Sequence, residues 1–335
     1  MDIKENLSLK EFNTFGLDAK CRYFTSIENI NDLVEIINTY EGEDILILGG
    51  GSNILLTKDY QGMVIHNQIK GIEIESEDAD HVVITVSGGE IWQDLVDFAL
   101  ANDLGGIENL SLIPGLVGAA PIQNIGAYGV ELKDVLVSLD AIDLATGELR
   151  TFMNEECKFG YRNSVFKNEY LNKFFIISVR IQLDKEPAVN TAYGAINSVL
   201  ESKGITNPTI QNVSDVVIEI RQSKLPDPAV LGNAGSFFKN PVIDKIYYEA
   251  LQLEFPDIPG YIDGESVKVP AAWLIDQSGW KGVRRGNVGV HDLQPLVLVN
   301  HGGGTGAEIL SLANEILDSI AIKFGIELEP EPRII

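Results

Sequence analysis

Apolar and polar positions alternate along the chain with two spacings, one typical of helices and one typical of strands. Apolar side chains recur every three or four positions in three segments, residues 29–40, 91–101 and 309–324, which predicts three amphipathic helices. Gly325 is the expected C-terminal stop of the last helix. Short apolar or β-branched runs predict strands at residues 44–48, 82–87 and 174–183. Helices and strands are therefore mixed, and the pattern predicts an α+β fold.

One stretch interrupts this regular pattern. Residues 222–228 contain Pro226 and Pro228, and proline removes a backbone donor and restricts the preceding residue. We expect this stretch to break regular structure and to mark a domain junction.

Composition narrows the classes of protein. The 335 residues carry 25 basic and 49 acidic side chains, for a formal net charge of −24, which disfavours nucleic acid and anionic membranes as partners. The sequence contains no run of about 18 apolar residues that would predict a membrane span, and we expect no signal segment at the N-terminus. We expect a cytoplasmic protein. Its two cysteines, Cys21 and Cys157, are too far apart in sequence to suggest a disulfide framework or a metal site.

Two glycine-rich loops are candidates for binding phosphate. The first follows the strand predicted at 44–48 and consists of Gly49, Gly50, Gly51, Ser52 and Asn53. Successive glycines let backbone N–H groups approach an anion closely. The loop lacks the Gly-x-Gly-x-x-Gly order and the Walker lysine, so neither a Rossmann nor a P-loop site is indicated. A tight turn without a ligand is the alternative.

The second loop spans residues 111–129 and is rich in glycine and alanine. Small side chains would let its backbone line a flat or phosphorylated ligand. Gln123, Asn124 and Tyr128 could orient such a ligand through hydrogen bonds. A packed glycine-rich connection is the alternative.

A single serine stands out in the C-terminal third. Ser236 follows Gly235 and precedes Phe237 and Phe238, and we expect it on a glycine-flanked turn. Because no histidine lies near it in sequence, a Ser-His-Asp hydrolase is disfavoured, and proton donation is the chemistry left for this hydroxyl.

Together these segments resemble UDP-N-acetylenolpyruvoylglucosamine reductase, the FAD-dependent family of peptidoglycan precursor synthesis. The resemblance covers nearly the whole chain and rests on residues 13–16, 49–53, 113–129, 160–167, 232–241 and 328–333. Ala192-Tyr193-Gly194 and residues 224–228 are similar to the longer form of the family, which carries an extra tyrosine loop.

The resemblance implies a fold and a domain division. A two-part FAD-binding region of the vanillyl-alcohol-oxidase (PCMH-like) type would be followed by a C-terminal α+β substrate-binding domain. Its first part would be residues 1–64, with the tail 328–335 packing near the active site, and its second part residues 65–223. The substrate-binding domain would be residues 224–327.

The resemblance also implies a reaction. Noncovalent FAD would be reduced by NADPH and pass hydride from N5 to C3 of the enolpyruvyl group of a UDP-sugar, giving UDP-N-acetylmuramate. Ser236 would protonate C2, and Arg162 and Glu331 would stabilise the negative charge that develops. Such an enzyme serves cell-wall biogenesis, and through it cell shape and division. We expect a monomer.

Binding residues follow by the same resemblance. Those expected to hold the cofactor are Gly49, Gly50, Gly51, Ser52, Asn53, Pro114, Gly115, Gly118, Gln123, Asn124, Gly126, Ala127, Tyr128, Gly129 and Arg221. Those expected to hold the UDP-sugar are Tyr193, Lys224, Asn240 and Gln294. No metal site is expected.

Two other functions remain open at this point. One is a flavin-dependent alcohol oxidase of the same FAD-binding class, and the other is a nucleotide-sugar binding protein without turnover. Ser236, Arg162 and Glu331 together favour the reductase.

Overall fold

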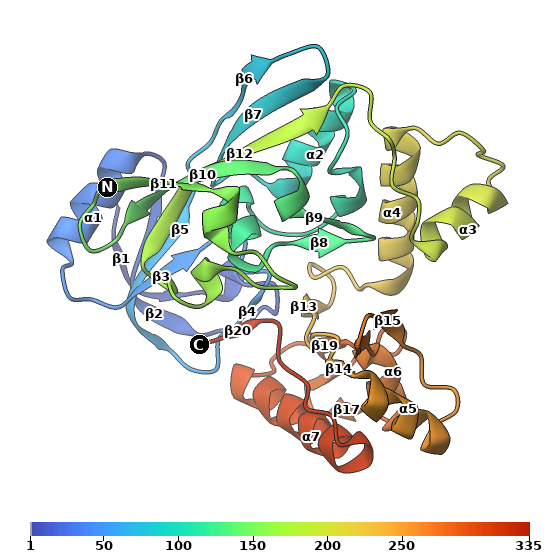
Figure 1. Cartoon of the computed structure of the whole chain (residues 1–335). Helices are drawn as coiled ribbons and strands as arrows, with labels where there is room; N and C mark the ends of the chain where they lie inside the picture. The colour runs from blue at the N-terminus through green and yellow to red at the C-terminus, as the bar shows by residue number, and fades with distance from the viewer. Residues whose placement is uncertain (1) are drawn as a thin grey trace. The chain divides into compact units, whose positions relative to one another are not determined.

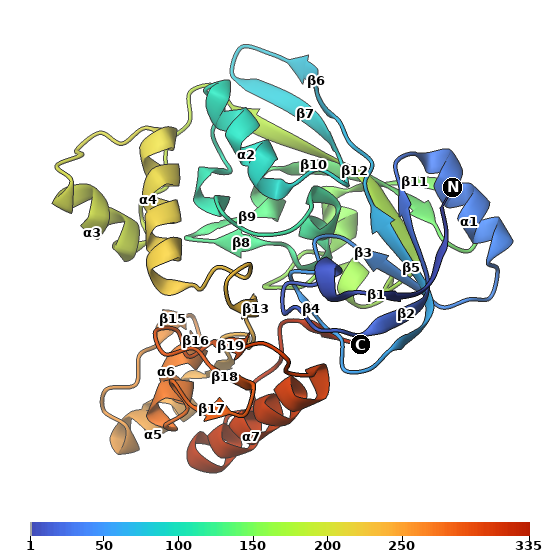
Figure 2. The same ribbon diagram turned by 180° about the vertical axis from the view of Figure 1, so that it is seen from behind.

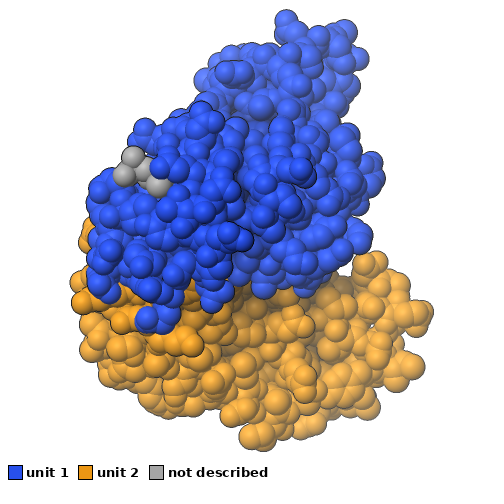
Figure 3. Space-filling view, turned by 90° about the vertical axis from the view of Figure 1, so that its left-hand side faces the viewer, with its two compact units in different colours: residues 1–7, 21–50, 61–223 blue, residues 8–20, 51–60, 224–335 orange. Residues whose placement is uncertain are grey.

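The computed structural model describes residues 2–335 and divides them into two compact units, which we describe separately (Figure 3). The first unit is formed by the chain up to Leu7, residues 21–50 and residues 61–223. The second unit is formed by residues 8–20, 51–60 and 224–335. The three-part domain division expected from the sequence stays a prediction.

A four-stranded sheet opens the first unit, apart from a few strand-end residues that belong to the second. Its order is β1 (Lys4–Ser8), β2 (Lys20–Ile27), β5 (Tyr60–Asn67) and β3 (Ile45–Leu48), with β3 parallel to β5. Helix α1 (Ile30–Thr39) packs its buried Leu33 and Ile36 with Met63 of β5. The Asn29 side chain accepts a hydrogen bond from the Asp32 N–H at 3.0 Å and caps the helix. The predicted helix at 29–40 and strand at 44–48 are confirmed.

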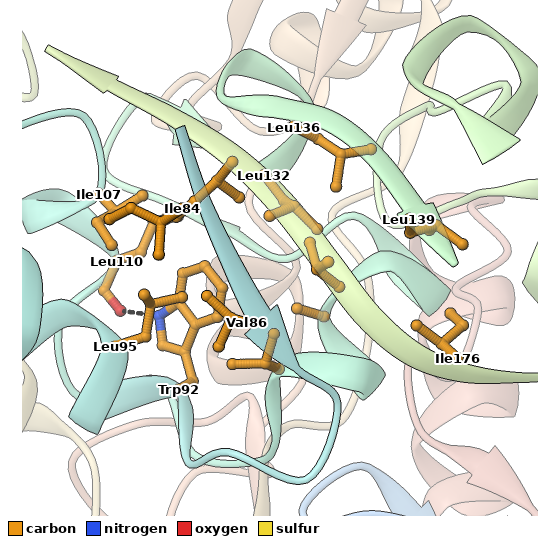
Figure 4. Close-up of a cluster of buried hydrophobic side chains, with 14 of the residues drawn as sticks. Ile84, Val86, Trp92, Leu95, Ile107, Leu110, Leu132, Leu136, Leu139 and Ile176 are labelled. Carbon is orange, nitrogen blue, oxygen red and sulfur yellow. Dashed lines mark hydrogen bonds between the residues drawn. The ribbon is translucent and has the colours of Figure 1, made fainter. Parts of the chain in front are cut away.

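A five-stranded antiparallel sheet holds most of the core of the first unit. Its order is β11 (Leu149–Met153), β10 (Leu136–Asp143), β12 (Phe174–Asp184), β7 (His81–Ser87) and β6 (Ile72–Glu77). Helix α2 (Trp92–Ala101) buries Trp92 against apolar side chains of β7, and the indole Nε1–H donates to the Leu110 carbonyl at 3.0 Å (Figure 4). The strands predicted at 82–87 and 174–183 and the helix predicted at 91–101 are confirmed.

Two helices complete the first unit. Helices α3 (Gly194–Ser202) and α4 (Ile210–Lys224) bury Ile196, Leu200 and Val217 together in a small apolar cluster. The sequence predicted a break from residue 222, but α4 continues to Lys224. That prediction was wrong by three residues because proline restricts chiefly the residue directly before it, here Leu225.

The second unit combines small sheets with helices. One sheet has the order β13 (Gly232–Ser236), β19 (Val297–Asn300), β18 (Val288–Val290) and β17 (Arg284–Arg285), and another has the order β14 (Val242–Asp244), β16 (Ser266–Lys268) and β15 (Tyr261–Asp263). Its helices are α5 (Lys245–Glu254), α6 (Ala271–Gln277) and α7 (Gly306–Phe324). Helix α7 begins with a capping box between Thr305 and Glu308 and ends at Gly325, whose φ is 63°. The predicted C-terminal helix and its stop are confirmed.

Each unit also contains short strands and 3-10 helices. Strand β20 (Arg333–Ile334) pairs in parallel with β4 (Ile54–Leu55) in the second unit, and β8 (Gly126–Ala127) pairs with β9 (Val130–Glu131) in the first. The 3-10 helices are η1 (Lys10–Phe12), η2 (Glu108–Leu110), η3 (Val117–Gln123), η4 (Leu132–Asp134), η5 (Asn154–Cys157) and η6 (Val165–Lys167). The mixture of elements confirms the α+β class (Figures 1 and 2). Among residues 2–335, no helix combines the length and the apolar composition needed to cross a bilayer.

Candidate active site

The two glycine-rich loops meet in the first unit. A Cβ placed on Gly50 would lie 3.1 Å from the Gly115 Cα, and one placed on Gly49 would lie 3.5 Å from the Ala119 Cβ. The first of these distances is shorter than ordinary van der Waals contact, so the loops approach as closely as glycine allows. Segments 65 residues apart thus form one surface of small residues and backbone groups.

Gly51 is glycine for a different reason. It belongs to the second unit, has a φ of 59°, and a Cβ there would lie 2.0 Å from the Phe12 carbonyl oxygen. Its own carbonyl accepts a hydrogen bond from the Thr14 N–H at 3.2 Å. Backbone packing alone therefore requires this glycine, as the tight-turn alternative supposed.

Helix η3 (Val117–Gln123) lies within the second glycine-rich loop, and Asn124 is its C-terminal cap residue. A Cβ on Gly118 would lie 2.9 Å from the Gly88 carbonyl oxygen, so close packing explains this glycine too. The Asn124 side chain donates to Glu131 at 2.9 Å and to the Gly160 carbonyl at 3.2 Å, and accepts from the Lys133 N–H at 3.0 Å. Both amide N–H groups of Asn124 are thus hydrogen-bonded within the protein, and these bonds stabilise the conformation of the loop.

Beyond Asn124, the chain forms the β8–β9 hairpin. The two residues of its turn, Tyr128 and Gly129, have φ values of 50° and 83°, as in the tight hairpin turns that match strand twist. Tyrosine is an unfavourable residue at positive φ, so the backbone of Tyr128 is strained in this turn. The Tyr128 ring meets the Tyr193 ring edge-on at 5.3 Å between centroids.

Arg162 also occupies a strained position. It lies in the turn between Gly160 and Asn163 with a φ of 52°, a conformation in which glycine or asparagine is usual. Its Nη2–H donates to the Gly126 carbonyl at 2.6 Å. A Cβ on Gly126 would lie 3.1 Å from Arg162 Nη1. The guanidinium is therefore held against the second glycine-rich loop, at a cost in backbone strain that is typical of functional sites.

Arg221 on α4 is a partly buried cation. Its Nε is buried and has no hydrogen-bond partner among residues 2–335. Burial lowers the pKa of Arg221 below its ordinary value; Tyr128 raises it, and the like charge of Arg162 lowers it further. Burial in turn raises the pKa of Tyr128. A guanidinium with a buried, unused donor beside a second cation fits an anionic group such as a phosphate.

Tyr193 stands at the start of α3, as its N-terminal cap residue. Its side chain is 47% exposed although it contacts Tyr128. The structure therefore brings one predicted substrate residue, Tyr193, next to one predicted cofactor residue, Tyr128, within the first unit.

Ser236 lies in the second unit at the irregular end of β13. It pairs with Val297 of β19 after a shift in register, and Gly235 before it has a φ of 69°. The Gly235 N–H donates to the Asn233 side chain at 2.9 Å. The sequence predicted a turn, and that was wrong: pairing with β19 extends the strand to the serine, while the positive φ of Gly235 supplies the bend.

The C-terminal tail runs beside Ser236 in the second unit. The Glu331 N–H donates to the Phe237 carbonyl at 2.8 Å, and the Lys239 N–H donates to the Glu329 carbonyl at 2.9 Å. Glu331 is thus hydrogen-bonded to Phe237, the residue after Ser236, although 94 positions separate Glu331 from Phe237 in sequence.

Residues 13–16 are hydrogen-bonded to β13 and to its neighbour β19. The Asn233 N–H donates to the Thr14 carbonyl at 3.0 Å, and the Asn300 side chain donates to the Phe15 carbonyl at 2.9 Å. A Cβ on Gly232 would lie 2.3 Å from that Phe15 oxygen. The chemistry of residues 13–16 predicts no functional role, and only the family resemblance identifies this segment as part of the pattern.

The other residues expected to hold the substrate have different settings. Lys224 is the exposed last residue of α4. The Asn240 side chain accepts a hydrogen bond from the Ala271 N–H at 2.9 Å, and the Gln294 side chain accepts one from the Leu296 N–H at 3.4 Å. Asn240 and Gln294 each keep their amide N–H groups for other contacts.

Comparison with known proteins gives consistent matches. The FAD binding domain family matches residues 21–152, and the UDP-N-acetylenolpyruvoylglucosamine reductase C-terminal domain family matches residues 227–335. The UDP-N-acetylenolpyruvoylglucosamine reductase of Flavobacterium johnsoniae is 50% identical, over 100% of both chains. That of Pseudomonas aeruginosa is 48% identical over 100% of this chain and 99% of its own.

A solved structure shares the fold. The crystal structure of UDP-N-acetylenolpyruvylglucosamine reductase from Thermus caldophilus matches with a TM-score of 0.71 at 22% identity. The match covers 100% of this chain and 99% of that one.

Proposed function

The chain belongs to the UDP-N-acetylenolpyruvoylglucosamine reductase family, and we propose that it catalyses the reaction for which the family is named. The observation that carries this proposal is the full-length match at 50% identity. The chain is an FAD-dependent oxidoreductase that uses NADPH to reduce the enolpyruvyl ether of UDP-N-acetylglucosamine to UDP-N-acetylmuramate, a step of peptidoglycan precursor synthesis.

The residues proposed to hold FAD come from both glycine-rich loops and from α4. Close approach of Gly50 and Gly115 leaves room for its phosphates beside backbone N–H groups of both loops, and Arg221 supplies a positive charge whose Nε is buried. Tyr128 offers a ring at the turn of β8–β9. FAD, when bound, accepts hydride from NADPH and delivers it to the substrate.

Ser236 is proposed to donate the proton to C2 of the enolpyruvyl group. Hydride addition at C3 leaves negative charge at C2 and in the carboxylate, and a hydroxyl is an adequate acid toward so basic a carbon. Gly235 and the pairing with Val297 fix its backbone. The neighbouring Glu331, held through Phe237, is proposed to help stabilise the same charge.

Arg162 is proposed to bind the substrate carboxylate. One of its nitrogens already donates to Gly126, and the fork of a guanidinium keeps further donors for a carboxylate. The strained backbone of Arg162 supports a functional role for its head group.

Tyr193, Lys224, Asn240 and Gln294 are proposed as contacts to the UDP-sugar. Lys224 is exposed and supplies a positive charge suited to a diphosphate. The three-part domain division, the monomeric state, the cytoplasmic location and the links to cell shape and division also belong to this proposal.

Anaerobic turnover in D2O with unlabelled NADPH tests the reaction. We expect UDP-N-acetylmuramate carrying deuterium at C2 and hydrogen from NADPH at C3. Failure to reduce the enolpyruvyl ether here, together with consumption of an alcohol and oxygen in a parallel aerobic assay, would instead identify an alcohol oxidase. Tight binding of the UDP-sugar with no product would identify a binding protein.

A further inference from the structure

Asn109 links two segments of the proposed site without belonging to either. It lies in η2, and its side chain is fully buried in the first unit. Its Nδ2 donates to the Tyr128 carbonyl at 3.0 Å and to the Asn190 carbonyl at 2.9 Å. These two acceptors lie 19 and 81 positions away in the sequence.

The orientation of this amide is determined by its neighbours. Both acceptors are carbonyl oxygens, so only the nitrogen can face them and the amide cannot be flipped. Its Oδ1 is consequently buried without a hydrogen-bond partner in the described part of the chain. A buried unpaired oxygen destabilises a protein, and the two bonds that Nδ2 donates are what offset this cost at Asn109.

The two acceptors lie in segments that carry aromatic side chains, Tyr128 in one and Tyr193 in the other. Tyr128 starts the turn of β8–β9, which points toward α4 (Figures 1 and 2). Asn190 precedes Tyr193 by three positions, and its side chain donates to the Gly129 carbonyl at 3.2 Å and accepts from the Ala192 N–H at 3.1 Å. The contact between the two tyrosine rings closes this loop of interactions.

We propose that Asn109 is a positioning residue that fixes the Tyr128–Gly129 turn and the segment before Tyr193 relative to each other. It holds Tyr193 where the UDP-sugar binds without touching substrate or FAD. The inference rests on the proposed function, because Tyr193 is taken as a substrate contact.

Asn109→Ala is the direct test, in the FAD-loaded enzyme. Loss of two bonds that align the segment should raise KM for the UDP-sugar about tenfold.

Asn154→Ala is the matched control. The Asn154 side chain also donates to two carbonyls, those of Lys133 at 2.8 Å and Leu136 at 2.7 Å, in the same unit. We expect a lower Tm with an unchanged KM. A surface variant, Asn190→Ala, keeps the core intact and should raise KM, and the double variant Asn109→Ala/Asn190→Ala should show less than the product of the two single effects.

Amide hydrogen exchange of the FAD-free protein gives a readout that needs no activity. Asn109→Ala should speed exchange at residues 186–193 by tenfold or more relative to Asn154→Ala. Equal exchange and equal KM in the two variants would overturn the proposal. A wild-type enzyme that does not reduce the UDP-sugar would refute the proposed function, whereas the exchange experiment would still decide whether Asn109 holds this segment.

Discussion

Replacing Arg221 with methionine should have opposite effects on the FAD-free protein and on FAD binding. The Arg221 guanidinium has a buried Nε without a hydrogen-bond partner in residues 2–335. The groups that act on its pKa, besides burial, are Tyr128 and the like-charged Arg162. An anion is the partner that this arrangement lacks.

The magnitudes follow from that setting. Removing a partly buried charge whose Nε has no hydrogen-bond partner in residues 2–335 should raise the free energy of unfolding of the FAD-free protein by about 1 kcal/mol. If Arg221 donates a charge-assisted hydrogen bond to a phosphate of FAD, its loss should cost about 1.5–3 kcal/mol, a rise in Kd of about 10- to 150-fold.

The assay pairs urea unfolding of the FAD-free protein with titration of FAD. Arg180→Met is the matched control, because Arg180 donates to Asp140 at 2.9 Å and to Glu75 at 3.0 Å in the same unit. That variant should lose stability and keep the wild-type Kd for FAD. A loss of stability in FAD-free Arg221→Met together with an unchanged Kd would refute the reasoning.

Three further outcomes are expected. Ser236→Ala should leave reduction of the flavin by NADPH nearly intact and slow its reoxidation by the UDP-sugar at least a hundredfold, measured by stopped flow; equal slowing of both half-reactions would exclude a proton donor. Lys224→Ala should raise KM for the UDP-sugar with kcat nearly unchanged, and an unaltered KM would remove Lys224 from the site. Burial tends to raise the pKa of Asp140, but hydrogen bonds from Arg180 and Thr151 outweigh it and lower that pKa. The stability that Asp140 adds is therefore present above its ordinary pKa of 3.8 and lost as pH falls through the lower folded value. Asp140→Asn should be about 1 kcal/mol less stable than wild type at pH 7, and the difference in urea unfolding should shrink below pH 4; a constant difference would contradict this.

Local sequence patterns predicted the regular elements because those patterns are also what stabilises them. The helix at 309–324 has an apolar stripe, and a glycine follows it. Both are physical causes that act within a few residues. The break expected at 222–228 began too early because Pro226 restricts chiefly Leu225, and α4 continues to Lys224.

The site was less predictable because its causes lie far apart in the sequence. Gly50 and Gly51 are adjacent, yet one is needed for contact with Gly115 and the other for its positive φ beside Phe12. No pattern within the loop separates these reasons. Asn109 likewise looks like an ordinary polar residue until Tyr128 and Asn190 are seen to meet it.

Family resemblance supplied what residue chemistry could not. Arg162 and Glu331 have no local signal, since an arginine in a turn and a glutamate near a terminus are usually solvated. The structure adds two observations for them, the positive φ of Arg162 and the bond between Glu331 and Phe237. Both are long-range or conformational features that a linear sequence does not display.

The most direct test of the central claim is an anaerobic visible spectrum of the purified protein through two additions. NADPH should bleach the flavin band, and the enolpyruvyl ether of UDP-N-acetylglucosamine should then restore it without oxygen. A protein without a flavin band would contradict the cofactor assignment. A band that bleaches and returns only when oxygen is admitted would contradict the reductase.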